Sequence, residues 1–290
     1  MGERSRKWKA FAKNHPICAF CGGSKPAETI EHYPPKSMFR QKLWPEGFEF
    51  PACDDCNSGS RTDDLIMAIV ARLDPLDGAA ARDDGSLNGL MSRLRYLRPT
   101  LLDEMIPSAR EARTLARQMQ VSRVDGKTFL ESRPFVRFTP TVQRAIQAFA
   151  LKLTKAIVYR EAKTIFPVDG SIFMTWSTNL DLLESGSYPI FDALQDLPGL
   201  VPEVKRHRDV LHDQFGYKWT ADSDIERFVI QVKIAFSIAF VVIGCPKPGV
   251  LEKLYLLEAH EANGRTAVLQ SQSLPLGRLR KLRQNQEIEK

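Results

Sequence analysis

The chain has 290 residues, of which 43% are hydrophobic and 26% are charged, so it can bury a core and is not an extended disordered chain. Its net charge of +6 favours a polyanionic partner such as nucleic acid. Four of its five cysteines lie in closely spaced pairs, which argues against a secreted disulfide framework and favours metal binding in a reducing cytoplasm.

The first 75 residues are predicted to form a small module. We expect a basic helix, two short strands and a second helix at residues 4–13, 29–33, 48–52 and 62–73. Pro34 and Pro35 end the first strand, and Thr62 suits the cap of the second helix. Residues 74–89 are rich in turn-forming residues and are predicted to be a linker, so the chain divides into 1–75 and 76–290.

The second unit is predicted to be a larger α+β domain with a long helix and an antiparallel sheet. Apolar residues at three- and four-residue spacing predict the long helix at 141–161, and shorter helices are expected at 90–97 and 108–119. Asp125-Gly126 indicates a hairpin within 121–138, and 171–178 is expected to be a strand. Apolar residues at every even position of 228–242 predict one long half-buried strand, or two strands joined by a bulge.

The apolar run at 234–245 is about half the length of a membrane-spanning helix, so we expect a buried strand and no membrane partner. Cys245, at its end, is expected to be a buried free thiol. The charged N-terminus is followed by no apolar signal region, and a cytoplasmic protein is expected.

Two CXXC pairs are the strongest signal in the chain. They are Cys18 with Cys21 and Cys53 with Cys56, separated by 31 residues. Two such pairs can supply four thiolates to one tetrahedral zinc ion, so a structural zinc is predicted here. His15 lies just before the first pair, but four thiolates already complete a tetrahedron, so it is expected to be structural.

Between the two pairs lies Glu31-His32-Tyr33-Pro34-Pro35, and Asn57 directly follows the last cysteine. This arrangement resembles the cysteine-bearing branch of the HNH endonuclease superfamily, over about residues 15–73. The resemblance implies a zinc-stapled ββα-metal fold with His32 as general base. It also implies that Glu31 and Asn57 are ligands of a catalytic divalent metal. Many members carry Asn where this chain has Phe48, five residues before the third cysteine, which bears on the geometry of the turn between the strands.

The residue chemistry agrees with this interpretation. One carboxylate and one amide oxygen suit a hard ion such as Mg²⁺ or Mn²⁺ better than zinc. A neutral imidazole can take a proton from an attacking water near neutral pH. Glu31 and His32 are adjacent, however, and would point to opposite faces of a strand unless the strand ends there.

The sequence therefore predicts a metal-dependent DNA endonuclease that leaves 5′-phosphate and 3′-hydroxyl ends, in phage defence or a mobile element. The alternative is a non-catalytic zinc-containing nucleic-acid-binding protein. Basic runs at 4–13 and 278–283 are expected to contact phosphates, although such runs are also typical of solvated helix faces. Residues 76–290 are expected to bind the target, form a homodimer or bind a regulatory partner.

Overall fold

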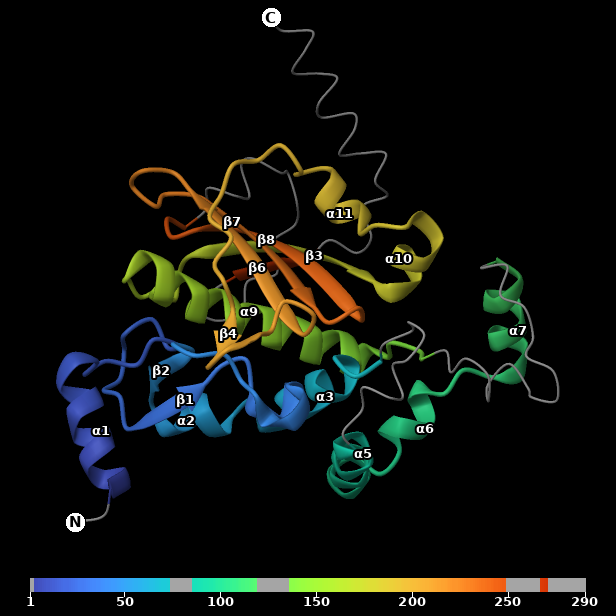
Figure 1. Cartoon of the computed structure of the whole chain (residues 1–290), viewed down its shortest axis with the longest axis horizontal. Coiled ribbons are helices and arrows are strands. Elements are labelled where there is room, and N and C mark those ends of the chain that lie inside the picture. Colours follow the sequence, from blue (N-terminus) through green and yellow to red (C-terminus); the bar gives the residue numbers. More distant parts are fainter. Residues whose placement is uncertain (1–2, 74–84, 119–135, 249–266, 271–290) are drawn as a thin grey trace, which may run out of the picture.

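The computed structural model describes residues 3–73, 85–118, 136–248 and 267–270. The predicted hairpin turn at Asp125-Gly126 and the basic run at 278–283 lie outside these residues. The described part is an α+β fold of mixed helices and a largely antiparallel sheet, as predicted (Figure 1).

The N-terminal part is a two-stranded antiparallel hairpin with helices around it. Thr29 pairs with Ala52 at one end of the hairpin, and His32 pairs with Glu49 at the other. Its elements are α1 (Glu3–Asn14), β1 (Thr29–His32), the 3-10 helices η1 (Lys36–Met38) and η2 (Arg40–Lys42), β2 (Glu49–Ala52), α2 (Asp54–Ser58) and α3 (Arg61–Val70). The predicted elements of this part are confirmed, and the short helix α2 was not predicted. The predicted cap at Thr62 is wrong, because α3 begins at Arg61 with Ser60 at its N-cap position.

Helix α9 (Pro140–Ala162) lies between the N-terminal hairpin and the large sheet (Figure 1). Thr139 caps it by accepting a hydrogen bond from the backbone N–H of Val142, and Pro140 occupies its first turn. Lys163, in a left-handed conformation, ends it. Three shorter helices precede it, α5 (Ser86–Leu97), α6 (Leu101–Met105) and α7 (Ala109–Gln118).

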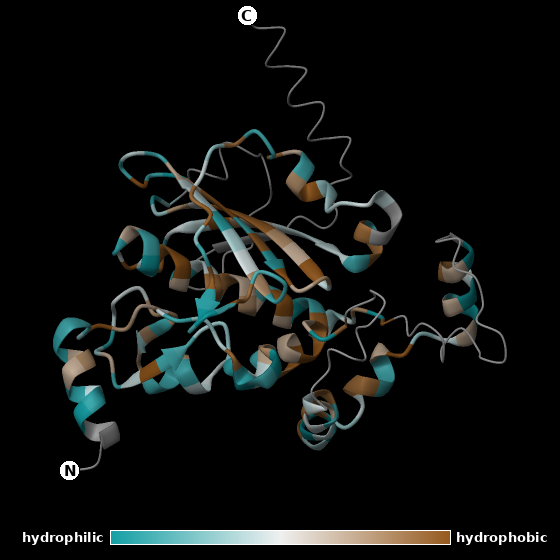
Figure 2. Ribbon diagram, viewed as in Figure 1, coloured by the Kyte–Doolittle hydropathy of each residue, from teal (hydrophilic) through white to brown (hydrophobic). Residues whose placement is uncertain are grey.

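The large sheet has the strand order β6-β7-β8-β3-β9, antiparallel except for the parallel pair of β3 with β9. Figure 2 shows hydrophobic residues along its strands, whereas the short strand β4 is hydrophilic. The elements of this part are β3 (Ser171–Thr178), α10 (Asn179–Ser185), α11 (Pro189–Asp192), β4 (Lys205–Arg206), β5 (Asp209–Val210), β6 (Phe215–Ala221), β7 (Phe228–Ile234), β8 (Ile238–Cys245) and β9 (Ala267–Gln270).

The predicted single or bulged strand over 228–242 is wrong, because β7 and β8 run in opposite directions around a tight turn. The turn contains Ala235, which has a φ of 46°. Ile234 pairs directly with Ile238, so even positions face even positions across the two strands. The period-two pattern therefore continues through the turn without a break, which hides the reversal in the sequence.

A continuous hydrophobic core extends from the N-terminal hairpin to the sheet. Phe149 of α9 illustrates the connection, with its ring centroid 5.3 Å from that of Tyr33 and 6.3 Å from that of Phe240. The Tyr33 hydroxyl also donates to the Phe149 carbonyl at 3.2 Å. The division of the chain at residue 75 stays a prediction. Side chains of α9 pack against both proposed units.

Cys245 is buried and makes no disulfide, as predicted. The apolar run at 234–245 is strand β8 with the turn before it, also as predicted. Within the described ranges, no helix combines the length and the apolar character needed to span a bilayer.

Candidate metal centre and hairpin site

The four cysteines of the CXXC pairs converge, although the pairs are far apart in sequence. Cys18 and Cys21 lie in the loop before β1, whereas Cys53 and Cys56 lie at the start of α2. All four Sγ atoms are within 4.8 Å of one another, and none forms a disulfide. Four thiolates around a zinc ion are roughly 3.8 Å apart, so this cluster could hold such a metal ion with small adjustments.

The environment of the cluster favours the thiolate form of Cys18, whereas it raises the pKa of Cys53 and Cys56. A hydrogen bond from the Cys56 side chain lowers the pKa of Cys18 to about 4, more than burial raises it. The backbone N–H of Phe20 also donates to the Cys18 Sγ at 3.4 Å. The metal-binding form of this thiol is therefore already stabilised by the fold.

The loop after the first cysteine pair needs its glycine. Gly22 has a φ of 64°, and a Cβ atom there would lie 2.5 Å from the Cγ1 atom of Val168. Val168 belongs to the segment that connects α9 to β3. The cysteine loop thus packs tightly against a segment of the chain in which Val168 lies 146 positions after Gly22.

His32 is the last residue of β1 and pairs with a carboxylate on the neighbouring strand. Its Nε2 lies 3.1 Å from Oε1 of Glu49, and its ring makes an edge contact with Trp44 at 5.6 Å between centroids. Burial, and then the charge of Lys36, lower the pKa of His32, while Glu49 opposes the shift. The imidazole is therefore held neutral near pH 7 and oriented by Glu49.

Glu31 points to a different environment. Its side chain is 8% exposed, and Oε1 lies 3.2 Å from Nζ of Lys152 in α9. Burial raises the pKa of Glu31 to about 7, and Lys152 limits the rise. The other oxygen, Oε2, is buried and has no hydrogen-bond partner in the described residues.

Lys152 connects Glu31 to the helices after the hairpin. It donates to the Cys56 carbonyl at 3.1 Å and to the Ser60 hydroxyl at 2.7 Å. Ser60 in turn donates to Asp64, whose Oδ1 is buried without a hydrogen-bond partner in the described residues. One buried ammonium therefore faces two buried carboxylates.

Asn57 lies half-buried in α2, directly after the last cysteine. Its Nδ2 donates to Oγ1 of Thr29 at 2.6 Å, so its Oδ1 is not used in this contact. Thr29 and Glu31 are two positions apart on β1 and therefore face the same side of the strand. Asn57 thus lies on the Glu31 side of the hairpin.

The three residues predicted as catalytic lie on the hairpin or in the helix directly after it, but each has its own partner. Glu31 contacts Lys152, His32 contacts Glu49, and Asn57 contacts Thr29. His32 is next to Glu31 and so faces the other side, at the end of the strand. Their joint role in binding a catalytic metal stays a prediction.

Other predicted side chains have structural contacts. His15 lies 2.7 Å from the Tyr159 hydroxyl through its Nδ1, as expected for a structural histidine. Phe48, where many HNH proteins carry Asn, is 1% exposed and packs in the core, and its carbonyl accepts from the Tyr33 N–H at 3.1 Å. The turn region is therefore braced by apolar packing and backbone hydrogen bonding.

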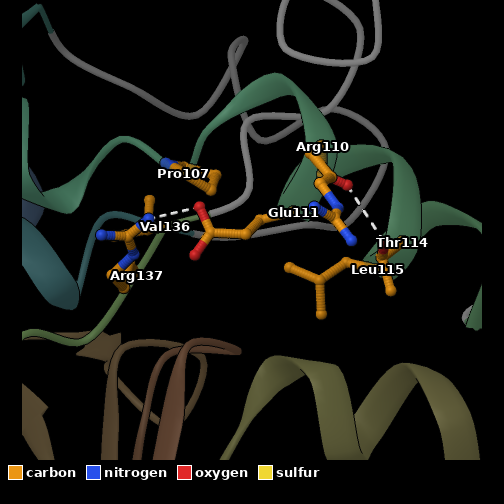
Figure 3. A pocket seen from close by; sticks show the side chains of 7 residues that line it. All are labelled: Pro107, Arg110, Glu111, Thr114, Leu115, Val136 and Arg137. Carbon is orange, nitrogen blue, oxygen red and sulfur yellow. Dashed lines mark hydrogen bonds and ion pairs between the residues drawn. The ribbon is translucent and has the colours of Figure 1, made fainter.

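A separate hollow lies beside α7, lined by the residues labelled in Figure 3. Its carboxylate, Glu111, is already engaged by Arg137 and Ser108. None of the predicted site residues lines it, so it carries no functional assignment.

Comparisons with known proteins give no family. No protein-family model, curated protein or solved structure matches the chain.

Proposed function

We propose that this chain is a metal-dependent endonuclease of the HNH type that hydrolyses DNA phosphodiester bonds. The observation that carries the proposal is the His32–Glu49 pair, with 3.1 Å between Nε2 and Oε1, at one end of the β1–β2 hairpin. The cysteine cluster lies at the opposite end of this hairpin. With Nε2 donating to Glu49, Nδ1 keeps a lone pair that can take a proton from the attacking water. With zinc bound, the cysteine cluster would hold together the segment before β1 and the segment after β2.

Glu31 and Asn57 are the proposed ligands of Mg²⁺ or Mn²⁺. The buried Oε2 of Glu31 has no partner in the described residues, which leaves a place for a cation. Asn57 lies on the same side and uses only its Nδ2 in the contact with Thr29. A bound divalent ion would neutralise the scissile phosphate and the leaving 3′-oxygen. Lys152, already 3.2 Å from Glu31, would then share that carboxylate with the ion.

A non-catalytic zinc-containing nucleic-acid-binding protein is the second candidate. The observation that favours it is the Glu31–Lys152 pair, since Glu31 already has a cationic partner. In that protein the hairpin would be a structural element and His32 a surface residue. In either case residues 76–290 are proposed to bind the target, form a homodimer or bind a regulatory partner.

Cleavage of supercoiled plasmid by the purified chain tests the proposal. We expect nicked or linear product with Mg²⁺ or Mn²⁺, none without a divalent ion, and 5′-phosphate and 3′-hydroxyl ends. Asn57→Ala should weaken the response to metal, so that extra Mn²⁺ recovers part of the activity. Absence of cleavage by zinc-loaded wild-type protein with either ion, while DNA is still bound, would favour the second candidate.

A further inference from the structure

Two cations beside His32 are held on one indole ring. Lys36 Nζ lies 3.5 Å from the centroid of a Trp44 ring, and the Arg206 guanidinium carbon lies 3.9 Å from it. Neither cation makes an ion pair with a carboxylate in the part of the chain that the structure describes. Trp44 also touches the His32 ring, so both cations lie near the proposed general base.

Arg206 reaches this place because the β4–β5 hairpin is anchored to the loop before β2. The Glu46 backbone N–H donates to the Lys205 carbonyl at 2.9 Å, and the His207 N–H donates to the Glu46 carboxylate at 2.8 Å. These two hydrogen bonds flank Arg206 on both sides. The backbone of Arg206 is thus held beside the loop that carries Trp44.

The charges around His32 are not balanced. Burial lowers the pKa of Lys36, Glu49 opposes this, and the charges of Lys7 and Arg206 lower it further. Glu49 is also in contact with both His32 and Lys7, at 3.1 Å and 3.0 Å. Lys7 is thus the cation that pairs with Glu49, while Lys36 and Arg206 lie nearby without a carboxylate partner in the described residues, an arrangement that an incoming anion would stabilise.

The indole is arranged to hold cations and not to stack on a base. Its ring is already covered by Lys36 and Arg206, and its edge contact with His32 has an interplanar angle of 86°. Cations held over an aromatic ring lose less freedom when they bind a ligand. The ligand chemistry that fits is a phosphodiester backbone, which needs no base readout.

We propose that Lys36 and Arg206, held over Trp44, form a phosphate-binding subsite that positions the DNA backbone beside His32. This inference rests on the proposed function and gives the β4–β5 hairpin of the second unit a part in substrate binding. Arg206 acts as a positioning residue. Neither Lys36, Trp44 nor Arg206 belongs to the residues for which the HNH resemblance implies a role.

The test is the salt dependence of DNA binding, measured by fluorescence anisotropy with a labelled duplex. All proteins carry His32→Ala, and no divalent metal is added, so that binding is separated from cleavage. Lys36→Gln and Arg206→Gln should each reduce the slope of log K against log salt by about 0.9, the loss of one phosphate contact. Arg206→Lys should keep the slope, because it keeps the charge.

Two further variants make the result specific. Arg113→Gln, on α7 at the other end of the molecule, removes the same charge and should leave the slope unchanged (Figure 1). Trp44→Leu leaves the net charge unchanged but should weaken binding, because it removes the ring that holds both cations. Circular dichroism spectra of each variant establish that it is folded.

The outcomes separate the subsite from the nuclease. A slope in Lys36→Gln and Arg206→Gln equal to that of Arg113→Gln overturns the subsite, even if the wild-type protein cleaves DNA. Absence of DNA binding by the parent protein overturns it as well. Reduced slopes in a chain that shows no cleavage support the subsite and count against the nuclease.

Discussion

Replacing Lys152 by Met should strongly destabilise the protein. The Lys152 ammonium lies 3.2 Å from Glu31, and its side chain is only 9% exposed. Its removal leaves Glu31 and Asp64, both buried, without the ammonium that faces them. The Cys56 carbonyl and the Ser60 hydroxyl also lose a hydrogen-bond donor.

The expected loss is about 3–5 kcal/mol in the free energy of unfolding, the usual cost of removing one partner of a buried ion pair. The loss should grow with pH. Burial already raises the pKa of Glu31 from 4.5 to about 7, and without Lys152 it rises further. A carboxyl whose pKa is raised on folding costs stability as the pH rises above its unfolded value. The variant should therefore lose more stability at about pH 8 than at about pH 6.

Urea denaturation of the zinc-loaded chain, followed by circular dichroism, measures this loss. Lys155→Met is the matched control, because Lys155 lies on the same helix and donates to a backbone carbonyl, that of Phe20, at 2.8 Å. Its loss should be on the order of 1.5 kcal/mol. Glu31→Gln should restore much of the stability of Lys152→Met. Equal losses in Lys152→Met and Lys155→Met, or no restoration by Glu31→Gln, would refute the reasoning.

Three other predictions follow from the same structure. Elemental analysis should find one zinc per chain, and Cys53→Ser should release it; a folded N-terminal module with less than half an equivalent would contradict this. Cleavage should rise with pH and level off, with a midpoint below 6.5, because burial lowers the pKa of His32 and only neutral imidazole accepts a proton; a midpoint above 6.5 would contradict it. Gly22→Ala should cost about 1–3 kcal/mol, because φ is 64° and the new Cβ would lie 2.5 Å from Val168; an unchanged melting temperature would contradict it.

Strong periodicity made much of the fold predictable. Helix α9 was expected at 141–161 and spans Pro140–Ala162, and strand β3 matches its predicted bounds. Strand β6 was missed, although Phe215, Tyr217 and Trp219 alternate in sequence and are all buried. The turn between β7 and β8 was missed because pairing of even with even positions leaves the pattern unbroken.

The site was predictable only in its local part. The spacing of the CXXC pairs was enough to predict the cysteine cluster, but the partners of the predicted catalytic residues come from distant elements. The position of Lys152 could have been used for prediction. It lies within the apolar stripe of α9, three positions after Phe149, and a buried lysine there needs a buried carboxylate. The position of Arg206 could not, since a two-residue strand in a polar loop has no pattern that places it over Trp44.

The rate of DNA cleavage by His32→Ala tests the central claim most directly. A general base contributes about 10²–10⁴-fold, so single-turnover cleavage with Mn²⁺ should slow by that factor while DNA binding and zinc content stay at wild-type values. His212→Ala is the control, because His212 is exposed in the loop after β5. This variant should cleave DNA at the wild-type rate. Wild-type cleavage by His32→Ala protein, free of contaminating nuclease, would contradict the account.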